Sequence, residues 1–236
     1  MQLVVMLLVI LALNGGFMLA LGGLARTDLA RRHRQRPDRQ SRVDARTYQR
    51  GVVTNVAVSI GLVFGVTLPL RSYLVLSEPV GVLRTVGEAA LILLLYDLGY
   101  YVMHRFAFHK WSVGRRIHAV HHSIRTPYAR DSLYIHPAET AAGVGLFLGC
   151  TALSGPVGLS SFGLAFLIYS LLNVFIHSAI DLRFFPLRSL TALVRHHDVH
   201  HDSMRSGYYA SITPLWDLVF GTAGSPHEQR SARYAD

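Results

Sequence analysis

The chain has 236 residues and a formal net charge of +9; 51% of its residues are hydrophobic, and its mean hydropathy is +0.32. This composition excludes an ordinary soluble globular domain and favours a membrane protein. The single cysteine, Cys150, can form no intrachain disulfide and supplies no thiolate cluster. Iron–sulfur clusters and cysteine-based zinc sites are therefore excluded as well.

The first membrane segment is predicted at residues 3–24, which are almost uninterruptedly apolar and long enough to cross a bilayer as a helix. No Lys or Arg precedes this run, so we interpret it as an anchor helix and not as a cleaved secretory signal. Residues 25–50 then hold nine Arg and three Asp. Such a run can bind nucleic acid or anionic lipid, but between two apolar segments it is typical of a cytoplasmic connection.

Three further apolar regions follow, at residues 52–70, 86–103 and 138–176. The last is too long for one helix, and the Ser154-Gly155-Pro156 break divides it into two. We therefore expect about five membrane segments, or four with a re-entrant pair.

The basic residues predict how these segments are oriented. Of the 23 Lys and Arg, nine lie in residues 25–50, two in 71–84, six in 104–136 and six in 177–236. Alternating sides places the three rich regions together in the cytoplasm and the N-terminus outside. We expect the bacterial inner membrane, with every histidine cluster on the cytoplasmic side.

Eight of the 13 histidines fall into three spaced clusters. Two clusters share the spacing H-x-x-H-H, which on a helix places three imidazoles on one face. A lone histidine is usually solvated or satisfied in a core, but three such clusters predict a metal centre. The clustered histidines are His104, His109, His118, His121, His122, His197, His200 and His201.

Three residues outside the clusters extend this hypothesis. His177 lies where the last membrane segment leaves the bilayer, so we expect it to be a ninth ligand, with Asn173 beside it at i, i+4 as a supporting residue. His136 precedes a proline at a helix start and is either a tenth ligand or a residue on the substrate side.

The first cluster requires a break in its helix. His104 and His109 are five residues apart, which places them about 140° from each other on a regular helix. They converge only if the helix ends or bulges between them. We expect this interruption to let one cluster serve two metal ions.

Asp97, Tyr101 and His104 follow one another at i, i+4 and i+7 and so share a helical face. A carboxylate near the membrane is costly and usually functional. We expect Asp97 to accept the second ring N–H of a ligating histidine. An ion pair with Arg105 or Arg116 is the alternative.

The ligand type and count restrict the chemistry. Imidazole suits Zn, Cu, Fe and Ni, so ligand type alone does not choose the metal. Nine or ten ligands supply two ions with four or five each, whereas a structural zinc needs four. No cluster contains the glutamate of a zinc protease, H-E-x-x-H. Two metals at a bilayer surface favour oxygen chemistry on a lipid.

Six motifs over roughly residues 90–222 resemble the fatty acid hydroxylase/sterol desaturase superfamily. They are D-x-x-x-Y-x-x-H-R-x-x-x-H, H-x-V-H-H-S, H-P-x-E, N-x-x-x-H-S, H-x-V-H-H and L-W-D-x-V-F-G-T, at Asp97–His109, His118–Ser123, His136–Glu139, Asn173–Ser178, His197–His201 and Leu215–Thr222. The resemblance implies an integral-membrane non-haem di-iron oxygenase that uses two Fe²⁺ ions, O₂ and two external electrons. It implies no catalytic residue outside the metal centre, and ligand roles for His104, His109, His118, His121, His122, His177, His197, His200 and His201.

The expected fold is therefore all-α: an integral membrane helical bundle of about 4–5 segments with a cytoplasmic, histidine-rich helical cap. We divide the chain into N-terminal membrane helices with the Arg-rich loop (1–85), a catalytic domain (86–222) and a polar tail (223–236). The expected substrate is a membrane lipid such as a fatty acyl chain, sterol or carotenoid; hydroxylation is the favoured reaction, and desaturation is the alternative.

The basic cytoplasmic face has two interpretations: it docks an acidic electron donor, such as a ferredoxin or a cytochrome b5-like protein, or it only sets topology and contacts anionic lipid. We expect no nucleic acid as a partner. A membrane haem or electron-transfer protein and a metal transporter are the alternative functions. The transporter would place its ligands near the bilayer midplane, where this sequence has no histidine.

Overall fold

The computed structural model describes residues 1–33, 43–181 and 187–224. These parts of the chain are helical, and their β-structure is limited to one isolated bridge between Val75 and Val157, which confirms the all-α prediction. In chain order the elements are α1 (Gln2–Leu24), α2 (Asp28–Arg32), α3 (Ala45–Thr67), α4 (Arg71–Leu74), α5 (Val82–Val102), η1 (Met103–Phe108), α6 (Ser112–His118), η2 (His121–Ser123), η3 (Ala129–Leu133), α7 (Pro137–Leu153), α8 (Leu159–Ile176), α9 (Leu187–Asp202) and α10 (Leu215–Val219).

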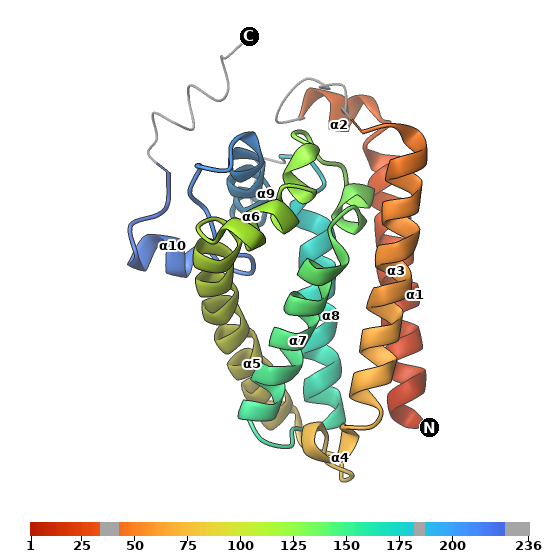
Figure 1. Ribbon diagram of the computed structural model, residues 1–236. Helices are drawn as coiled ribbons and strands as arrows, with labels where there is room; N and C mark the ends of the chain where they lie inside the picture. Colours follow the sequence, from red (N-terminus) through yellow and green to blue (C-terminus); the bar gives the residue numbers. More distant parts are fainter. Residues whose placement is uncertain (34–42, 182–186, 225–236) are drawn as a thin grey trace.

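Five long helices, α1, α3, α5, α7 and α8, form an up-and-down bundle (Figure 1). Helix α8 packs against both α5 and α1, and α3 packs against α7. The short elements α2, α6, α9 and α10 lie together at one end, and α4 lies at the other (Figure 1). The bundle therefore has two unlike ends, and the one that carries α9 also carries every histidine cluster.

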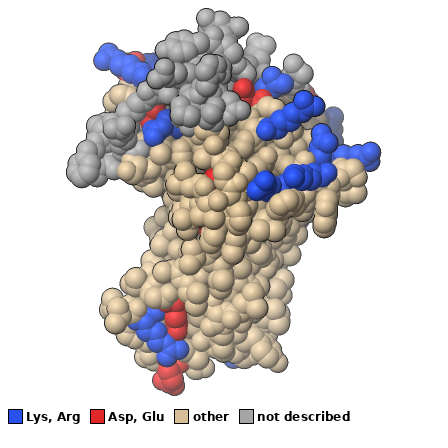
Figure 2. All heavy atoms as spheres, turned by 90° about the vertical axis from the view of Figure 1, so that its left-hand side faces the viewer, with Lys and Arg blue, Asp and Glu red and all other residues tan. Residues whose placement is uncertain are grey.

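Four helices are long and apolar enough to cross a membrane: Gln2–Leu24, Ala45–Thr67, Val82–Phe108 and Leu159–Ile176. Helix α7 is apolar but shorter, at 17 residues. The expectation of four to five membrane segments is confirmed. Lys and Arg gather at the two ends of the molecule, and the surface between them is almost uncharged (Figure 2).

The core of the bundle is closed by large apolar side chains from four of its helices. Leu7, Ile92, Phe147 and Phe162 are at most 1% exposed. Many of the remaining large apolar side chains, such as Leu83 and Leu153, point outward and are over 80% exposed. Such a surface is typical of a protein that contacts lipid, because exposing apolar patches of this extent to water is unfavourable.

Capping residues define where the helices of the histidine-rich end begin. Asp44 accepts hydrogen bonds from the backbone of Arg46 and Thr47 at the start of α3. Pro137 occupies the first turn of α7, as predicted for His136-Pro137. Gly114 lets α6 lie against η1, because a Cβ there would come within 1.9 Å of the Ala107 carbonyl oxygen.

Candidate metal centre

The nine histidines predicted as ligands converge at the α9 end of the bundle. Ring nitrogens of four of them lie within 4.8 Å of one another in each of two groups. The first group is His104, His109, His118 and His200, and the second is His121, His177, His197 and His201. His197 is partly buried, and the other seven are buried. We call these the first and second histidine groups.

The ninth histidine, His122, lies between the two groups. Its Nε2 is 3.0 Å from Nε2 of His118 and 3.1 Å from Nε2 of His200, both in the first group. Its ring stacks on that of His201, in the second group, with centroids 5.0 Å apart. His122 therefore lies beside the first group, with its Nε2 within contact distance of two of its members.

A π-helical turn brings the first cluster together. Residues Met103–Phe108 form this turn, and the amide of His109 donates to the carbonyl of His104 at 3.1 Å, an i→i+5 bond. The extra residue per turn swings His109 round to the side of His104, as the spacing required. Both histidines lie in the first group, however, so the expectation that this cluster divides between two metals is wrong.

The outer ring nitrogens of five of these histidines are anchored to the backbone, whereas Nδ1 of His121 and of His122 has no partner among the described residues. Because a carbonyl oxygen can only accept, each Nδ1 that contacts one carries the proton, and its Nε2 keeps the lone pair. Nδ1 donates from His104 to Tyr209 (2.8 Å), from His109 to Met204 (2.8 Å), from His177 to Asn173 (2.6 Å), from His200 to Gly207 (2.9 Å) and from His201 to Ile124 (2.9 Å).

In these five histidines, and in His118, whose Nδ1 contacts Glu139, Nε2 carries no proton and faces the other rings. His104 and His118 are 2.9 Å apart at Nε2, and His177 and His197 also 2.9 Å. Lone pairs held this close repel unless a cation lies among them. The arrangement therefore fits a metal ion in each group and explains why neutral imidazoles are buried together.

Burial keeps these imidazoles neutral. It lowers the pKa of His109 and of His177 from the ordinary 6.5 to about 4. The pKa values of His121, His122, His197, His200 and His201 are lowered too, first by burial and then by the neighbouring histidines. The unprotonated form, which is the one that binds metal, is therefore the native form at neutral pH.

Asp97 does not contact a histidine, so the predicted role is wrong. Its carboxylate accepts the backbone N–H groups of Ser211, Ile212 and Thr213 at 2.8–3.3 Å, and the Thr213 hydroxyl at 2.6 Å. A carboxylate one and a half turns before the π-helix faces the C-terminal loop and not the ligand rings. Neither alternative ion-pair partner, Arg105 or Arg116, forms a described salt bridge with it.

The carboxylate that does hold a ligand ring is Glu139. Its Oε1 accepts the Nδ1–H of His118 at 2.9 Å, and both side chains are at most 7% exposed. The histidine-proline-x-glutamate motif contained this residue, but only His136 of that motif was considered as a site residue. The available sequence signal was a carboxylate in the first turn of an apolar helix.

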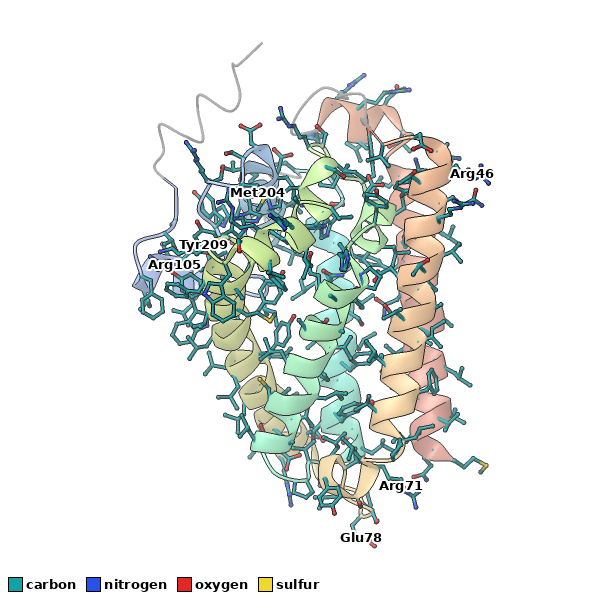
Figure 3. The ribbon with its side chains drawn as sticks, in the orientation of Figure 1. Arg46, Arg71, Glu78, Arg105, Met204 and Tyr209 are labelled. Atoms are coloured by element: carbon teal, nitrogen blue, oxygen red, sulfur yellow. The ribbon has the colours of Figure 1, made fainter. Side chains whose placement is uncertain are left out.

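A second carboxylate, Asp217, accepts hydrogen bonds from the same loop as Asp97. This loop comprises residues 204–213, and we call it the anchor loop. Asp217 accepts the N–H groups of Tyr209 and Ala210, each at 2.9 Å. Asp97 holds the next three amides. The two acids therefore fix the loop whose Tyr209 carbonyl positions His104; Tyr209 and Met204 lie beside Arg105 at the same end (Figure 3).

Gly207 in the anchor loop is required by a close backbone approach. A Cβ there would lie 2.0 Å from the Thr222 carbonyl oxygen. The following residue, Tyr208, has φ 62° and donates its amide to that same carbonyl. The loop therefore has one tight conformation, in which the Gly207 carbonyl reaches His200.

The two remaining predicted residues have different positions. Asn173 supports a ligand, as expected, but through its backbone carbonyl, which accepts from His177. His136 belongs to neither histidine group; its Nδ1 accepts the amide of Ala138 at 3.1 Å and caps α7. It therefore caps α7, and of its two predicted alternatives the tenth ligand finds no support in this position.

A cavity of about 200 Å³ opens from the second histidine group into the bundle. His121, His177 and His197 line its metal end. Its walls come from α1, α3, α5, α7 and α8 and are largely apolar or aromatic, with Val63, Phe166 and Tyr169 among them. The space between the membrane helices therefore leads directly to the converging imidazoles.

Comparison with known proteins agrees with the geometry. The family model described as fatty acid hydroxylase matches residues 89–222. Methylsterol monooxygenase 1 from Rattus norvegicus is 35% identical over 129 residues, which cover 53% of this chain and 43% of that protein.

Two other relatives match a larger share of the chain. A cholesterol 25-hydroxylase-like protein from Danio rerio is 35% identical over 158 residues, covering 62% of this chain and 59% of the relative. A very-long-chain aldehyde decarbonylase from Oryza sativa subsp. indica is 30% identical over 164 residues, covering 66% and 56%. The chain thus spans about half the length of these curated relatives. No solved structure matches it.

Proposed function

The chain belongs to the fatty acid hydroxylase family, and on that premise we propose that it is a membrane oxidoreductase that hydroxylates an unactivated C–H bond of a lipid, with O₂ as co-substrate. One observation carries this proposal. Two adjacent groups of histidines with converging Nε2 atoms lie at one end of the bundle, and a largely apolar cavity between the membrane helices ends at the second group. That arrangement supports the proposal, because a lipid chain in this cavity would lie against a metal bound there.

We propose that the metal is iron, one Fe²⁺ in each histidine group, with His122 as an additional donor in the first. Bound iron would supply the redox chemistry that activates O₂ for attack on a C–H bond. The relatives named as methylsterol monooxygenase and cholesterol 25-hydroxylase-like support an oxygenase, and their names favour hydroxylation over desaturation.

The protein's own residues position this centre and exclude water from it. The carbonyls of the anchor loop and the carboxylate of Glu139 hold each Nδ1–H of the first group, so that the lone pairs stay directed inward. The cavity walls would hold the lipid, and the cavity reaches the imidazoles at the second group. The alternatives of a haem protein or a transporter are disfavoured because the histidines converge at one end of the bundle and not at its middle.

The external electrons would enter on the basic face beside the first group. A hollow of about 350 Å³ is lined by Ser112, Arg115, Arg116 and Met204 among others. The Met204 carbonyl is the one that accepts from His109, so a single backbone group separates this hollow from a ligand. We propose that an acidic donor, ferredoxin or cytochrome b5-like, docks here, with this end of the bundle in the cytoplasm.

The test is metal content and turnover in the purified protein. We expect about two iron ions per chain, no haem absorption band, and reductant-dependent conversion of a lipid to a product 16 mass units heavier. His200→Ala should lose iron and turnover, whereas His33→Ala, a histidine outside both groups, should keep both. Full iron and turnover in His200→Ala would overturn the assignment.

A further inference from the structure

The cavity holds an acceptor atom that the protein leaves without a donor. Asn14, near the middle of α1, lines the cavity, and its buried Oδ1 has no hydrogen-bond partner among the described residues. A polar side chain at mid-membrane is costly, and a buried amide oxygen without a donor adds to that cost. A structural role alone does not account for this atom.

The orientation of the Asn14 amide is determined by its neighbours. Its Nδ2 donates to the Ile10 carbonyl at 2.9 Å and to the Ser170 hydroxyl oxygen at 2.8 Å. Because a carbonyl accepts only, the amide cannot be rotated by half a turn without losing this bond. Oδ1 is therefore committed as an acceptor.

The cavity is also lined by Glu139 and His121 near the histidines, where Glu139 Oε2 and His121 Nδ1 lack partners as well, but the polar side chains packed near Asn14 have theirs. Asn55 donates to the Leu133 carbonyl and accepts from the Thr140 hydroxyl. The Ser170 hydroxyl donates to the Leu167 carbonyl and accepts from Asn14. Asn14 Oδ1 on α1 is thus a hydrogen-bond acceptor without a donor, deep in the cavity. A ligand that contacts it must donate an N–H or O–H group.

The position of this acceptor sets the depth at which the guest needs its donor. Ser170 and His177 are seven residues apart in chain on α8, so the Asn14–Ser170 pair lies roughly 10 Å farther into the membrane than His177. If the reacting carbon of a lipid lies at the second histidine group, the part of the lipid about two helical turns away from that carbon lies beside the Asn14–Ser170 pair.

We propose that Asn14 is a specificity-determining residue that accepts a hydrogen bond from a hydroxyl group of the lipid substrate. The substrate class is then a hydrocarbon body with one hydroxyl, and not an unsubstituted hydrocarbon. This inference rests on the proposed function, because it takes the cavity to be the substrate site. It adds a residue of α1, which lies outside the region matched by the family model.

The experiment measures binding and not turnover, so that it is independent of the redox chemistry. Purified full-length protein with its metal would be titrated with two matched pairs: cholestanol against its 3-deoxy analogue cholestane, and octadecanol against octadecane. A satisfied hydrogen bond of this kind changes affinity by about tenfold. We expect the alcohol to bind about tenfold more tightly than its hydrocarbon in one of the two pairs. The pair that shows this difference indicates whether the substrate has a sterol-like or a straight-chain skeleton.

Two variants then separate recognition from helix packing. Asn14→Leu should keep hydrocarbon binding and lose the preference for the alcohol. Ser170→Ala also removes the α1–α8 hydrogen bond but leaves Oδ1 in place through Ile10, so it should retain most of the preference. If Asn14→Leu does not fold, the wild-type comparison still decides.

Equal binding of alcohol and hydrocarbon in the wild type, or binding of neither, overturns the proposal, as does an Asn14→Leu variant that keeps the preference. An Oδ1 that is merely hydrated would give the first of these results. A clear alcohol preference in a protein that holds no iron and shows no turnover would instead overturn the proposed oxygenase function and leave the role of Asn14 standing.

Discussion

Oε1 of Glu139 accepts the Nδ1–H of His118 at 2.9 Å in the buried interior of the molecule. The carboxylate charge strengthens this bond and holds the ring in the tautomer that directs Nε2 to the other histidines. Glu139→Gln should therefore lower iron retention or turnover by about 10–100-fold while membrane levels stay normal. Iron bound after dialysis against a weak chelator measures this.

The matched control for Glu139 is Glu88, a second acid within a membrane helix. Glu88 pairs with Arg84 and accepts from Ser161 at the other end of the bundle. Glu88→Gln should leave iron retention unchanged. Equal iron loss in the two variants would mean that Glu139 acts through general stability and not through His118.

Asp97 provides a test of the anchor loop. Asp97→Asn replaces an acceptor oxygen by an NH₂ group that faces backbone donors, so the hold on Ser211, Ile212 or Thr213 should be lost. We expect faster amide hydrogen exchange at residues 211–213, together with weaker iron retention, because His104 and His200 depend on this loop. If the variant retained less iron but its amides at residues 211–213 exchanged at the wild-type rate, Asp97 would act on the metal by another route.

Gly207 should tolerate no side chain. Gly207→Ala places a methyl group 2.0 Å from the Thr222 carbonyl oxygen, so the loop must shift and its hydrogen bond from His200 should break. We expect a loss of iron binding of at least tenfold, in line with other lost supporting contacts, which cost about 10–100-fold. Gly145→Ala, where a Cβ meets nothing within 4 Å, is the control and should bind iron normally.

The stability of the metal-free protein should depend on pH through its buried imidazoles. The pKa of His109 and of His177 is about 4 in the folded chain and near the ordinary 6.5 once unfolded. Between these values the unfolded chain binds more protons, so stability is full above pH 6.5 and falls as the pH drops toward 4. Melting temperatures in detergent at pH 7.5, 6 and 5 would show this decline, and a rise on acidification would contradict it.

Accessibility labelling tests the proposed orientation. In a Cys150→Ala background, a cysteine at the exposed Ser203 should react with an impermeant reagent only after the cells are opened, and one at the exposed Ser77 should react in intact cells. Arg71 and Glu78, which flank Ser77 in the chain, lie at the end opposite Arg105 and Met204 (Figure 3). The reverse labelling pattern would invert the topology.

The sequence by itself determined the features that depend on local patterns. Apolar runs of sufficient length predicted the membrane helices, because the bilayer imposes that length on any spanning helix. The spacing of His118, His121 and His122, and the five-residue gap between His104 and His109, predicted convergent rings and a helix interruption; the interruption is the π-helical turn. Both follow from the geometry of a single helix.

Only the tertiary structure decided which groups meet across the chain. It places His104 with His200 and His177 with His197, and it gives the ring-holding role to Glu139 while Asp97 holds the anchor loop. Helical periodicity shows which face a residue occupies but not which distant backbone lies opposite that face. In the sequence, Asn14 is a single polar residue in an apolar run. That its Oδ1 lacks a donor is known only from the packing of α1 beside α8, because a hydrogen bond depends on the groups of both helices.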